Sequence, residues 1–409
     1  MKIIRSANIK EIDKICSRYL LRKKRVEETV RNIVEHVRLL GDEAVIKYAR
    51  KFDKARLSSR QLRITQAEIS GAYQNISPDF VSTLKLVIEN VNKFYKKQIK
   101  KSWKIKDEDG VILGEKITPI EKVGVYIPAG TAPLVSSVYM SVLPAKLAGV
   151  KRIVLVSPPD KHGNINPHIL VVADLLKVNE IYKVGGAQAI AALAFGTKII
   201  PKVDKIVGPG NIYVAEAKRQ VFGFVDIDMI AGPTELVVVA NKSGNISYIS
   251  ADLLAQAEHL DGLAILITTS KQLAREIKNK VDKGYIILAK NLNEAADITN
   301  RIAPEHLQIM LNNPKKFLLK ITNAGAIFLG DFTPVAVGDY VAGPSHVLPT
   351  TGTARFFSGL SLSDFIKSSH LISYSKKALD KMRVSLEKLA LIEGLTKHAD
   401  SVKVRFTEK

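Results

Sequence analysis

Apolar residues recur at helical spacing in the first hundred residues of the chain. One stripe runs from Val30 to Val37 and a second from Val81 to Val87, each with apolar side chains three or four positions apart. Positions with this spacing share one face of a helix. The pattern therefore predicts helices between residues 22 and 98.

The pattern changes near residue 150, where short β-branched runs begin to alternate with helical segments. Strands are expected over residues 153–156, 181–184 and 203–207, with helices over 168–176, 187–195 and 211–221. A second alternation has strands over 236–240, 263–267, 286–289, 307–310 and 326–329, with helices over 251–259, 272–280 and 292–302 and one from Pro314. Such alternation builds parallel sheets covered by helices. The expected fold class is α/β, with two tandem, incomplete Rossmann-like domains, a helical N-terminal region and a C-terminal helical arm.

The last eighty residues follow a different pattern. Residues 331–364 are rich in Gly, Pro, Ser and Thr, and a loop of this length in a compact protein is usually functional or disordered. We interpret it as functional because it also holds Phe, Leu and His. Beyond it, Leu379, Met382, Leu386 and Leu389 predict an amphipathic helix that ends near Gly394.

Composition narrows the class of protein. The 409 residues exceed the usual size of one core, and one cysteine excludes an intrachain disulfide framework, as expected in a reducing cytoplasm. No apolar run resembles a signal peptide or reaches the roughly 18 residues of a membrane helix. We expect a cytoplasmic protein without membrane contact.

The net charge of +21 is compatible with a nucleic-acid partner. The stretch from Lys93 to Lys106 holds seven lysines and no acidic residue. Its aromatic residues form no recognisable binding motif, and lysine runs are usually solvated helix faces. We therefore expect no nucleic-acid binding, and interpret the charge as steering anionic cofactors to the surface.

Half of the eight histidines lie close to a carboxylate or an amide, in four segments. These segments hold Gln256 with His259, Glu305 with His306, Asp339 with His346, and Glu393 with His398. Imidazole, amide and carboxylate groups suit a metal bound through nitrogen and oxygen, and ligation by several cysteines is excluded. A carboxylate beside an imidazole also suits general acid/base chemistry. The alternatives are a polar helix face for Gln256 and His259, and a capping Glu with a surface His for Glu305 and His306.

Two glycine-containing turns join an expected strand to an expected helix. They are Val184–Gln188 and Gly208–Asn211, and both can present backbone N–H groups to a phosphate at a helix N-terminus. Neither completes the G-x-G-x-x-G pattern, since Tyr213 stands where the last glycine of the second would be. The turns alone do not establish a dinucleotide site.

Read together, these segments and several others resemble histidinol dehydrogenase, the last enzyme of histidine biosynthesis. The resemblance extends over nearly the whole chain. The matching segments are Val123–Pro128, Gly185–Gly196, Gly208–Asn211, Glu216–Gln220, Ala231–Glu235, Leu254–His259, Ala303–Leu307, Gly338–Tyr340, His346–Thr350 and Glu393–His398.

The resemblance implies oxidation of L-histidinol through the aldehyde to L-histidine, with two NAD⁺ and one water. It implies Glu305 and His306 as the catalytic acid/base pair, and a homodimer in which one subunit completes the other's site. The implied zinc ligands are Gln256, His259, Asp339 and His398, the last from the second subunit. The implied NAD⁺ contacts are Tyr126, Gln188 and Asn211. The implied substrate contacts are Thr234, His346 and Glu393, together with His306 and the four zinc ligands; Thr234 stands where serine is frequent, but keeps the hydroxyl.

These roles give an expected division of the chain. Residues 1–21 would be a helical segment, and residues 22–125 with 235–360 a first Rossmann-like domain that carries the metal and catalytic residues. Residues 126–234 would form a second, NAD-binding domain. Residues 361–409 would form a helical dimerisation arm that reaches the neighbouring subunit.

The chemistry of aldehyde oxidation agrees with these roles. Hydride leaves from a tetrahedral adduct, which aldehyde dehydrogenases make with a cysteine thiolate. Cys16 has no motif around it, and we interpret it as a small buried hydrophobe. The remaining route is water activated by a carboxylate, with Glu305 as its base and His306 as the base for the alcohol. Two alternatives stay open: a dehydrogenase for another alcohol or aldehyde, and a basic nucleic-acid-binding protein on a degenerate enzyme fold.

Overall fold

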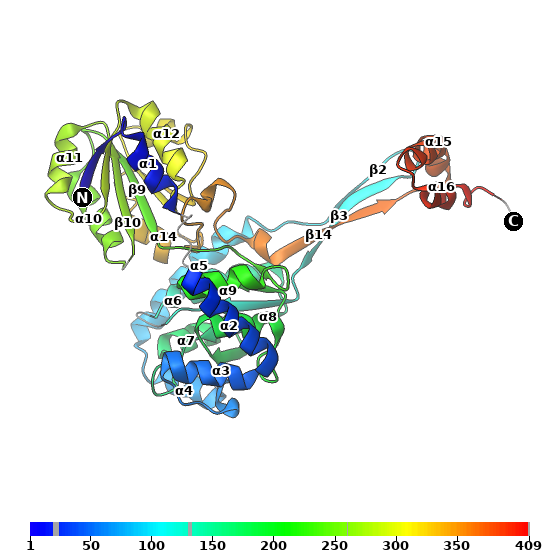
Figure 1. The fold of residues 1–409 in the computed structure, drawn as a ribbon, viewed down its shortest axis with the longest axis horizontal. Coiled ribbons are helices and arrows are strands. Elements are labelled where there is room, and N and C mark those ends of the chain that lie inside the picture. The colour runs from blue at the N-terminus through cyan, green and yellow to red at the C-terminus, as the bar shows by residue number, and fades with distance from the viewer. Residues whose placement is uncertain (19–23, 130–132, 260, 408–409) are drawn as a thin grey trace. The chain divides into compact units, whose positions relative to one another are not determined.

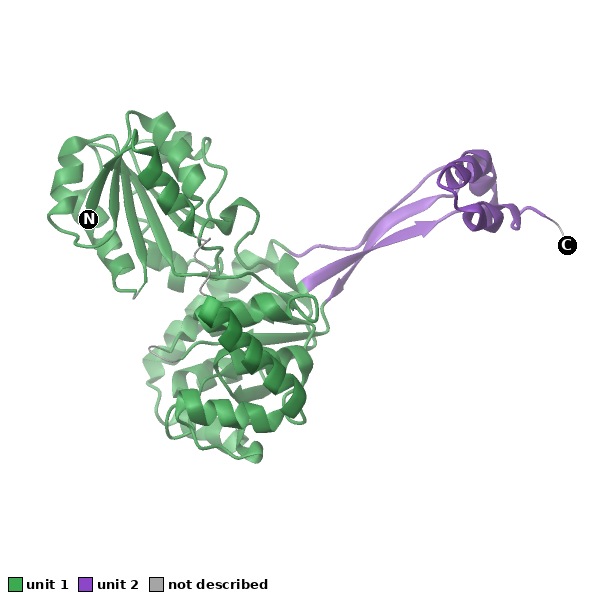
Figure 2. Cartoon of the chain, viewed as in Figure 1, with its two compact units in different colours: residues 1–98, 120–365 green, residues 99–119, 366–409 purple. Residues whose placement is uncertain are grey.

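The computed structural model describes residues 1–18, 24–129, 133–259 and 261–407, and has a mixed α/β fold (Figure 1). The chain forms two compact units (Figure 2). Unit 1 comprises Met1–Gln98 and Ile120–Phe365, and unit 2 comprises Ile99–Pro119 and Ile366–Lys409. Two parallel sheets lie in unit 1 and one antiparallel sheet lies in unit 2. Within the described residues, no helix is long and apolar enough to cross a membrane.

A five-stranded parallel sheet occupies the middle of the sequence. Its strands are β4 (Lys122–Tyr126), β5 (Arg152–Ser157), β6 (Glu180–Lys183), β7 (Lys205–Val207) and β8 (Asp226–Ile227), in the order β6-β5-β4-β7-β8. The helices between them are α6 (Val135–Ala148), α7 (Pro167–Leu175), α8 (Gly186–Phe195) and α9 (Ile212–Val221). The expected alternation of strands and helices from residue 153 to residue 221 is confirmed.

A six-stranded parallel sheet follows in the sequence. Its strands are β1 (Lys2–Arg5), β9 (Glu235–Ala240), β10 (Leu263–Thr268), β11 (Tyr285–Leu288), β12 (His306–Met310) and β13 (Ala326–Leu329), in the order β1-β11-β10-β9-β12-β13. The helices between β9 and β13 are α10 (Ile246–Ala257), α11 (Lys271–Lys278), α12 (Leu292–Ile302) and α13 (Pro314–Leu318). Val237 and Val239 belong to the core beneath α12, whereas Leu236 and Val238 belong to the core beneath α10 and α11. Both faces of this sheet are therefore covered, as parallel sheets require.

The N-terminal residues differ from the helical segment expected over residues 1–21. Lys2–Arg5 form an edge strand that pairs in parallel with Tyr285–Leu288, and the α-helix among the described residues 1–18 is α1, Ile9–Cys16. A four-residue strand carries no clear sequence period, and its partner lies about 280 residues away. The expected boundary between residues 21 and 22 falls outside the described residues.

The expected helices before residue 98 are present, but they pack differently from the assignment to a first domain with residues 235–360. They are α2 (Lys24–Leu40), α3 (Asp42–Tyr48), a π-helical turn (Ala49–Asp53), α4 (Gln66–Tyr73) and α5 (Pro78–Lys96). The α2 stripe from Val30 to Val37 is buried against the alanine-rich helix α8, and α2 also contacts α9. Helices α4 and α5 contact α7 and α6. These helices therefore pack on the helices that flank the five-stranded sheet. In the second stripe Leu84 and Val87 are buried, but Leu86 is exposed.

Unit 2 combines two distant parts of the chain. Strand β3 (Ile112–Pro119) pairs antiparallel with β2 (Trp103–Lys106) on one side and β14 (Ile366–Ser373) on the other. The helices α15 (Lys376–Ile392) and α16 (Thr396–Lys403) follow β14. The amphipathic helix expected before Gly394 is α15, and Gly394 has a left-handed backbone there, with φ of 74°. Residues 99–119, which were expected in the first domain, thus belong with the C-terminal segment.

The segment from 331 to 364 has little regular structure, as expected. It contains one short helix, α14 (Val335–Tyr340), and 3-10 turns at Thr353–Arg355 and Leu362–Phe365. The segment belongs to unit 1, and it brings the half-buried His346 and the buried Thr350 beside other unit 1 elements.

Candidate active site

The junction between α12 and β12 places a carboxylate and an imidazole next to each other. Helix α12 ends at Ile302, and Ala303 takes a left-handed conformation with φ of 48°. Pro304 comes next. Proline cannot continue a helix and disfavours the helical conformation of the residue before it, so α12 ends here. Glu305 then precedes β12, whose first residue is His306.

Glu305 and His306 are both buried, at 6% and 4% exposed. The Glu305 Oε2 atom lies 3.5 Å from His306 Nδ1. The Glu235 backbone N–H donates to Glu305 Oε2 at 2.9 Å, and the His306 Nδ1 atom lies 3.1 Å from the Glu235 carbonyl oxygen. The backbone of a single residue, Glu235 at the start of β9, therefore contacts both members of the pair. This burial rules out the alternative of a capping Glu with a surface His.

Burial raises the pKa of Glu305 to about 7, although the neighbouring His306 and the Thr234 hydroxyl oppose the rise. Burial alone would lower the pKa of His306, but the negative charges of Glu305 and Asp339 outweigh it and raise that pKa to about 9. Asp339 Oδ1 lies 3.6 Å from His306 Nε2, an electrostatic contact longer than a hydrogen bond. Near neutral pH the pair therefore consists of a carboxylate that titrates there and a protonated imidazole.

A cavity of about 370 Å³ opens beside His306 and is lined by residues of unit 1, among them Asp339 and His346. The His346 Nε2 atom lies 3.0 Å from Ser136 Oγ, and burial lowers the pKa of His346. A neutral imidazole and a carboxylate thus face the same space as His306. The structure brings His306, Asp339 and His346 together, as the sequence predicted for these segments.

Gln256 and His259 lie near one another, but not on one helix face as expected. Helix α10 ends at Ala257, two residues before His259. The turn at Gly262 keeps the two close: a β-carbon at Gly262 would lie 3.1 Å from Gln256 Nε2 and 3.0 Å from the His259 β-carbon. Gln256 is 5% exposed, and its Nε2 atom has no hydrogen-bond partner. A buried amide without a partner in the protein is free to pair with a bound group.

Glu393 and His398 belong to unit 2, where Glu393 is the C-cap residue after α15 and His398 is an exposed residue of α16. Among the residues that the structure describes, no group of three or more His, Cys, Asp or Glu side chains is arranged to hold a metal ion. Within unit 1 the expected zinc ligands are an amide, an imidazole and a carboxylate, from Gln256, His259 and Asp339.

The three expected NAD⁺ contacts gather at the carboxyl ends of strands in the five-stranded sheet. Tyr126 ends β4, Gln188 lies in the first turn of α8, and Asn211 caps the N-terminus of α9. Ligands of parallel α/β sheets bind at this edge. The Gln188 side chain is 1% exposed, and neither its oxygen nor its nitrogen has a partner.

The glycine turns before α8 and α9 pack closely against Tyr126. The Gly186 N–H donates to the Tyr126 hydroxyl at 3.1 Å, and burial raises the pKa of Tyr126 to about 12. Gly208 has φ of 116°, and a β-carbon there would lie 2.1 Å from the Tyr126 carbonyl oxygen, so only glycine fits. A buried ion pair fixes this turn: Lys218 Nζ donates to Asp228 Oδ1 at 2.6 Å and to the Gly208 carbonyl at 2.5 Å.

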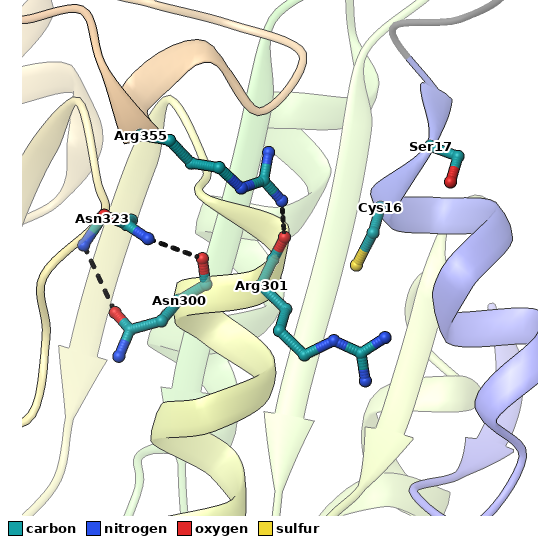
Figure 3. Close-up of a pocket in the computed structure, with 6 residues that line it drawn as sticks. All are labelled: Cys16, Ser17, Asn300, Arg301, Asn323 and Arg355. Carbon is teal, nitrogen blue, oxygen red and sulfur yellow. Dashed lines mark hydrogen bonds between the residues drawn. The ribbon is translucent and has the colours of Figure 1, made fainter.

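The lone cysteine lies in a different place. Cys16, at the end of α1, is half-buried and packs against the core of the six-stranded sheet. It lines a cavity of about 420 Å³ with Ser17, Asn300, Arg301, Asn323 and Arg355 (Figure 3). Burial raises the pKa of Cys16, which keeps it a thiol rather than a thiolate nucleophile.

Sequence reasoning missed Glu235, Arg18, Lys218 and Asp228 as parts of the site. Glu235 lies in the conspicuous segment Ala231–Glu235, but its partner Arg18 is 217 residues away. Lys218 and Asp228 gave no comparable signal, since Lys218 stood in the helix expected over residues 211–221 and Asp228 in a stretch with no expected element, and only the fold pairs them. Charged residues are almost never fully buried unless they are paired.

Comparison with known proteins identifies what this arrangement is similar to. A family model described as histidinol dehydrogenase matches residues 17–406. The histidinol dehydrogenase of Caldanaerobacter subterraneus subsp. tengcongensis is 48% identical over 421 residues, covering 97% of both chains. That of Clostridium acetobutylicum is 51% identical over 399 residues, covering 93% of this chain and 92% of the relative. The crystal structure of histidinol dehydrogenase from Elizabethkingia anophelis superposes with a TM-score of 0.93 at 37% identity, over 99% of this chain and 98% of that one.

Proposed function

The chain belongs to the histidinol dehydrogenase family of NAD-dependent oxidoreductases, and we propose that it oxidises L-histidinol through L-histidinaldehyde to L-histidine. Each turnover would use two NAD⁺ and one water and would complete histidine biosynthesis. The observation that carries the proposal is the buried pair of Glu305 and His306 beside a cavity that also exposes Asp339 and His346. We interpret the two parallel sheets with their helices as Rossmann-like domains, the five-stranded one binding NAD⁺.

The first oxidation removes a proton and a hydride from the carbinol. His306 would take the hydroxyl proton while hydride passes to the first NAD⁺, leaving the aldehyde. Beside Glu305 and Asp339, His306 holds a proton at neutral pH and must release it before acting as a base. Asp339 would raise the pKa of His306 less once its carboxylate is shared with a cation, which favours the base form.

The second oxidation needs an oxygen atom from water. Glu305 would take one proton from water as the oxygen attacks the aldehyde carbon and forms the hydrated adduct. A carboxylate with a pKa of about 7 is a stronger base than an ordinary glutamate and is still ionised at mildly alkaline pH. His306 would then take a hydroxyl proton of the adduct while hydride leaves to the second NAD⁺, giving the carboxylate product.

A zinc ion would be held by Gln256, His259, Asp339 and His398. The unpaired buried amide of Gln256 beside His259 supports this set, and its mixture of imidazole, amide and carboxylate donors suits zinc. When bound, the ion would hold the amino alcohol through its nitrogens and orient the carbinol carbon. Thr234, His346 and Glu393 would contact the substrate together with the ligands and His306.

We further propose that unit 2 mediates a homodimer in which His398 and Glu393 complete the site of a second copy. Unit 2 exposes large apolar side chains on its strands and helices, including Ile105 at 60%, Ile372 at 69%, Val384 at 73% and Ile392 at 72%. Exposed apolar residues gathered on a small unit are typical of a protein–protein interface.

NADH production from L-histidinol before and after chelation tests the function and its metal together. We expect activity with L-histidinol, much less with simple alcohols and aldehydes, and loss on chelation that zinc restores. Activity on simple aldehydes but not on L-histidinol would favour a dehydrogenase for another substrate. Full activity after complete removal of metal would contradict the zinc assignment.

A further inference from the structure

A single residue, Glu235, organises the surroundings of the acid/base pair through its backbone. Its N–H donates to Glu305 at 2.9 Å, and its carbonyl oxygen lies 3.1 Å from Nδ1 of His306. The N–H and the carbonyl belong to one residue and face the same edge of β9. A displacement of Glu235 would therefore disturb the carboxylate and the imidazole at once.

The Glu235 side chain is itself a buried carboxylate, with the residue 2% exposed. The Arg18 guanidinium meets it as a fork: Nε donates to Oε1, and Nη2 donates to Oε2 at 2.5 Å. The Thr351 N–H donates to Oε1 at 2.9 Å. Thr351 has φ of 54°, and the adjacent Thr350 Oγ1 accepts from the Gly232 N–H. The carboxylate thus ties Arg18 and the segment that carries His346 to the start of β9.

Arg18 connects the pair to two helix ends. Its Nη1 donates to the Ile15 carbonyl at 3.0 Å, and its Nη2 donates to the Ile302 carbonyl at 3.2 Å. Ile302 is the last residue of α12, three positions before Glu305. Arg355 donates to the neighbouring carbonyl of Arg301 (Figure 3). Two arginines therefore satisfy the carbonyls at the end of the helix that leads into the acid/base pair.

We propose that Arg18 and Glu235 are positioning residues of the acid/base pair, and that their buried ion pair keeps Glu305 and His306 aligned and balances the charge behind Glu305. This inference rests on the roles of Glu305 and His306 in the proposed function. A fork of two hydrogen bonds fixes orientation as well as charge, which a lysine could not do equally well.

The ion pair also has an electrical effect with a definite sign. The charged groups facing Glu305 are His306 on its own strand end and Glu235 on β9, with Arg18 behind Glu235. Removal of the Glu235 charge leaves Arg18 unbalanced and favours ionised Glu305. Removal of the Arg18 charge leaves the Glu235 carboxylate unbalanced and disfavours ionised Glu305.

The test compares Glu235→Gln, Arg18→Gln and the double variant in the full-length enzyme with zinc, using L-histidinaldehyde and NAD⁺. We expect each single variant to lose roughly tenfold or more in kcat through misalignment. The midpoint of the acid limb of the pH profile is expected to lie about half a pH unit lower than wild type in Glu235→Gln and higher by a similar amount in Arg18→Gln. The double variant, which buries no unpaired charge, is expected to return the limb to its wild-type position.

Arg301→Gln is the matched control. Arg301 also links α12 to α1, through Asp13, but its guanidinium is half-exposed and has no contact with Glu235 among those described. The acid limb of its pH profile is expected to stay at the wild-type position, and its kcat within about twofold of wild type. An equal effect of Arg301→Gln would show that any link between the two helices matters, and would overturn the proposal.

Infrared titration of the Glu305 carboxyl, taken as a difference from Glu305→Gln, gives the same comparison without substrate. Opposite displacements in the two single variants, cancelled in the double variant, support the proposal even if the wild-type chain failed to oxidise L-histidinaldehyde. Displacements in one direction, or none, overturn it while leaving the proposed function intact. If Arg18→Gln fails to fold, Arg18→Lys takes its place. Lysine keeps the charge, so the acid limb is expected to stay at its wild-type pH while kcat falls. A displaced limb in Arg18→Lys would overturn the proposal.

Discussion

The Nδ1 atom of His306 lies 3.5 Å from Oε2 of Glu305, and both side chains are buried at the start of β12. At this distance the charge of each group shifts the pKa of the other, in addition to the effect of burial. The pKa of Glu305 is raised to about 7 and that of His306 to about 9, so the two residues titrate in different ranges. Groups with separated pKa values can take separate roles in one site.

Replacement of Glu305 by glutamine should separate the two oxidations. The variant keeps the shape of the side chain and loses the base, so oxidation of L-histidinol to the aldehyde stage should persist. Aldehyde oxidation should fall by about a hundredfold or more, the usual contribution of a general base. The measurement is single-turnover NADH formation from L-histidinol and from L-histidinaldehyde. Glu276→Gln, at a half-buried position of α11 where the side chain accepts from Gln272, is the control. An equal loss in both oxidations would contradict the division of roles.

Aldehyde oxidation should rise with pH through about 7, because Glu305 must be ionised to accept a proton. The kcat/KM profile for L-histidinaldehyde measures this limb in the free enzyme. The limb should be absent from the remaining activity of Glu305→Gln. A profile that is flat between pH 6 and 8 would remove Glu305 as the base.

The same raised pKa has an opposite effect on stability. The folded chain holds the Glu305 proton more tightly than the unfolded chain, whose glutamate has the ordinary value of 4.5. The contribution of this group to stability is therefore fully present below pH 4.5 and is lost as the pH rises through about 7. Its sign is checked by the difference in unfolding free energy between wild type and Glu305→Gln, which should shift in favour of the variant as the pH rises.

Gln188→Ala should weaken NAD⁺ binding. The Gln188 amide is buried, and neither its oxygen nor its nitrogen has a hydrogen-bond partner. A cofactor that pairs with these atoms would gain the hydrogen bonds and also remove the free-energy cost of leaving buried polar atoms unpaired. We expect the KM for NAD⁺ to rise about tenfold, with zinc content unchanged. Gln272→Ala, on the surface of α11, serves as the control. An unchanged KM in Gln188→Ala would place the cofactor elsewhere.

Mixed dimers test whether His398 acts in a second copy. Glu305→Gln and His398→Ala should each be inactive in aldehyde oxidation when pure. When they are unfolded and refolded together, half of the dimers are mixed, and each mixed dimer has one intact site if His398 is contributed in trans. The mixture should therefore regain about a quarter of wild-type activity. No recovery, with mixed dimers verified by mass spectrometry, would contradict exchange between subunits.

The sequence predicted the parallel sheets well because their strands are buried on both faces and read as short apolar runs, such as Leu236–Ala240. It predicted neither β1, β4 and β8 nor the antiparallel sheet of unit 2. Strands β2 and β14 are exposed on both sides, so no burial pattern marks them, and β14 pairs with a strand more than 240 residues earlier. Pairing over such a distance depends on the whole fold rather than on local sequence.

The residues of the candidate site also divide into those that the sequence indicated and those that only the fold revealed. Glu305, His306, Asp339 and His346 could be singled out because titratable side chains stood in conspicuous segments, and the fold brings them close together. Glu235 and Arg18 were missed because an arginine and a glutamate 217 residues apart look like ordinary surface charges until the fold buries them. The end of α10 at Ala257 was also missed, since His259 keeps helical spacing beyond the helix.

The most direct test of the central claim is the stoichiometry of the complete reaction. A limiting amount of L-histidinol is incubated with excess NAD⁺ and the zinc-loaded enzyme, and NADH and the product are measured at completion. We expect two NADH and one L-histidine for each L-histidinol. One NADH with accumulation of the aldehyde, or no NADH at all, would contradict it.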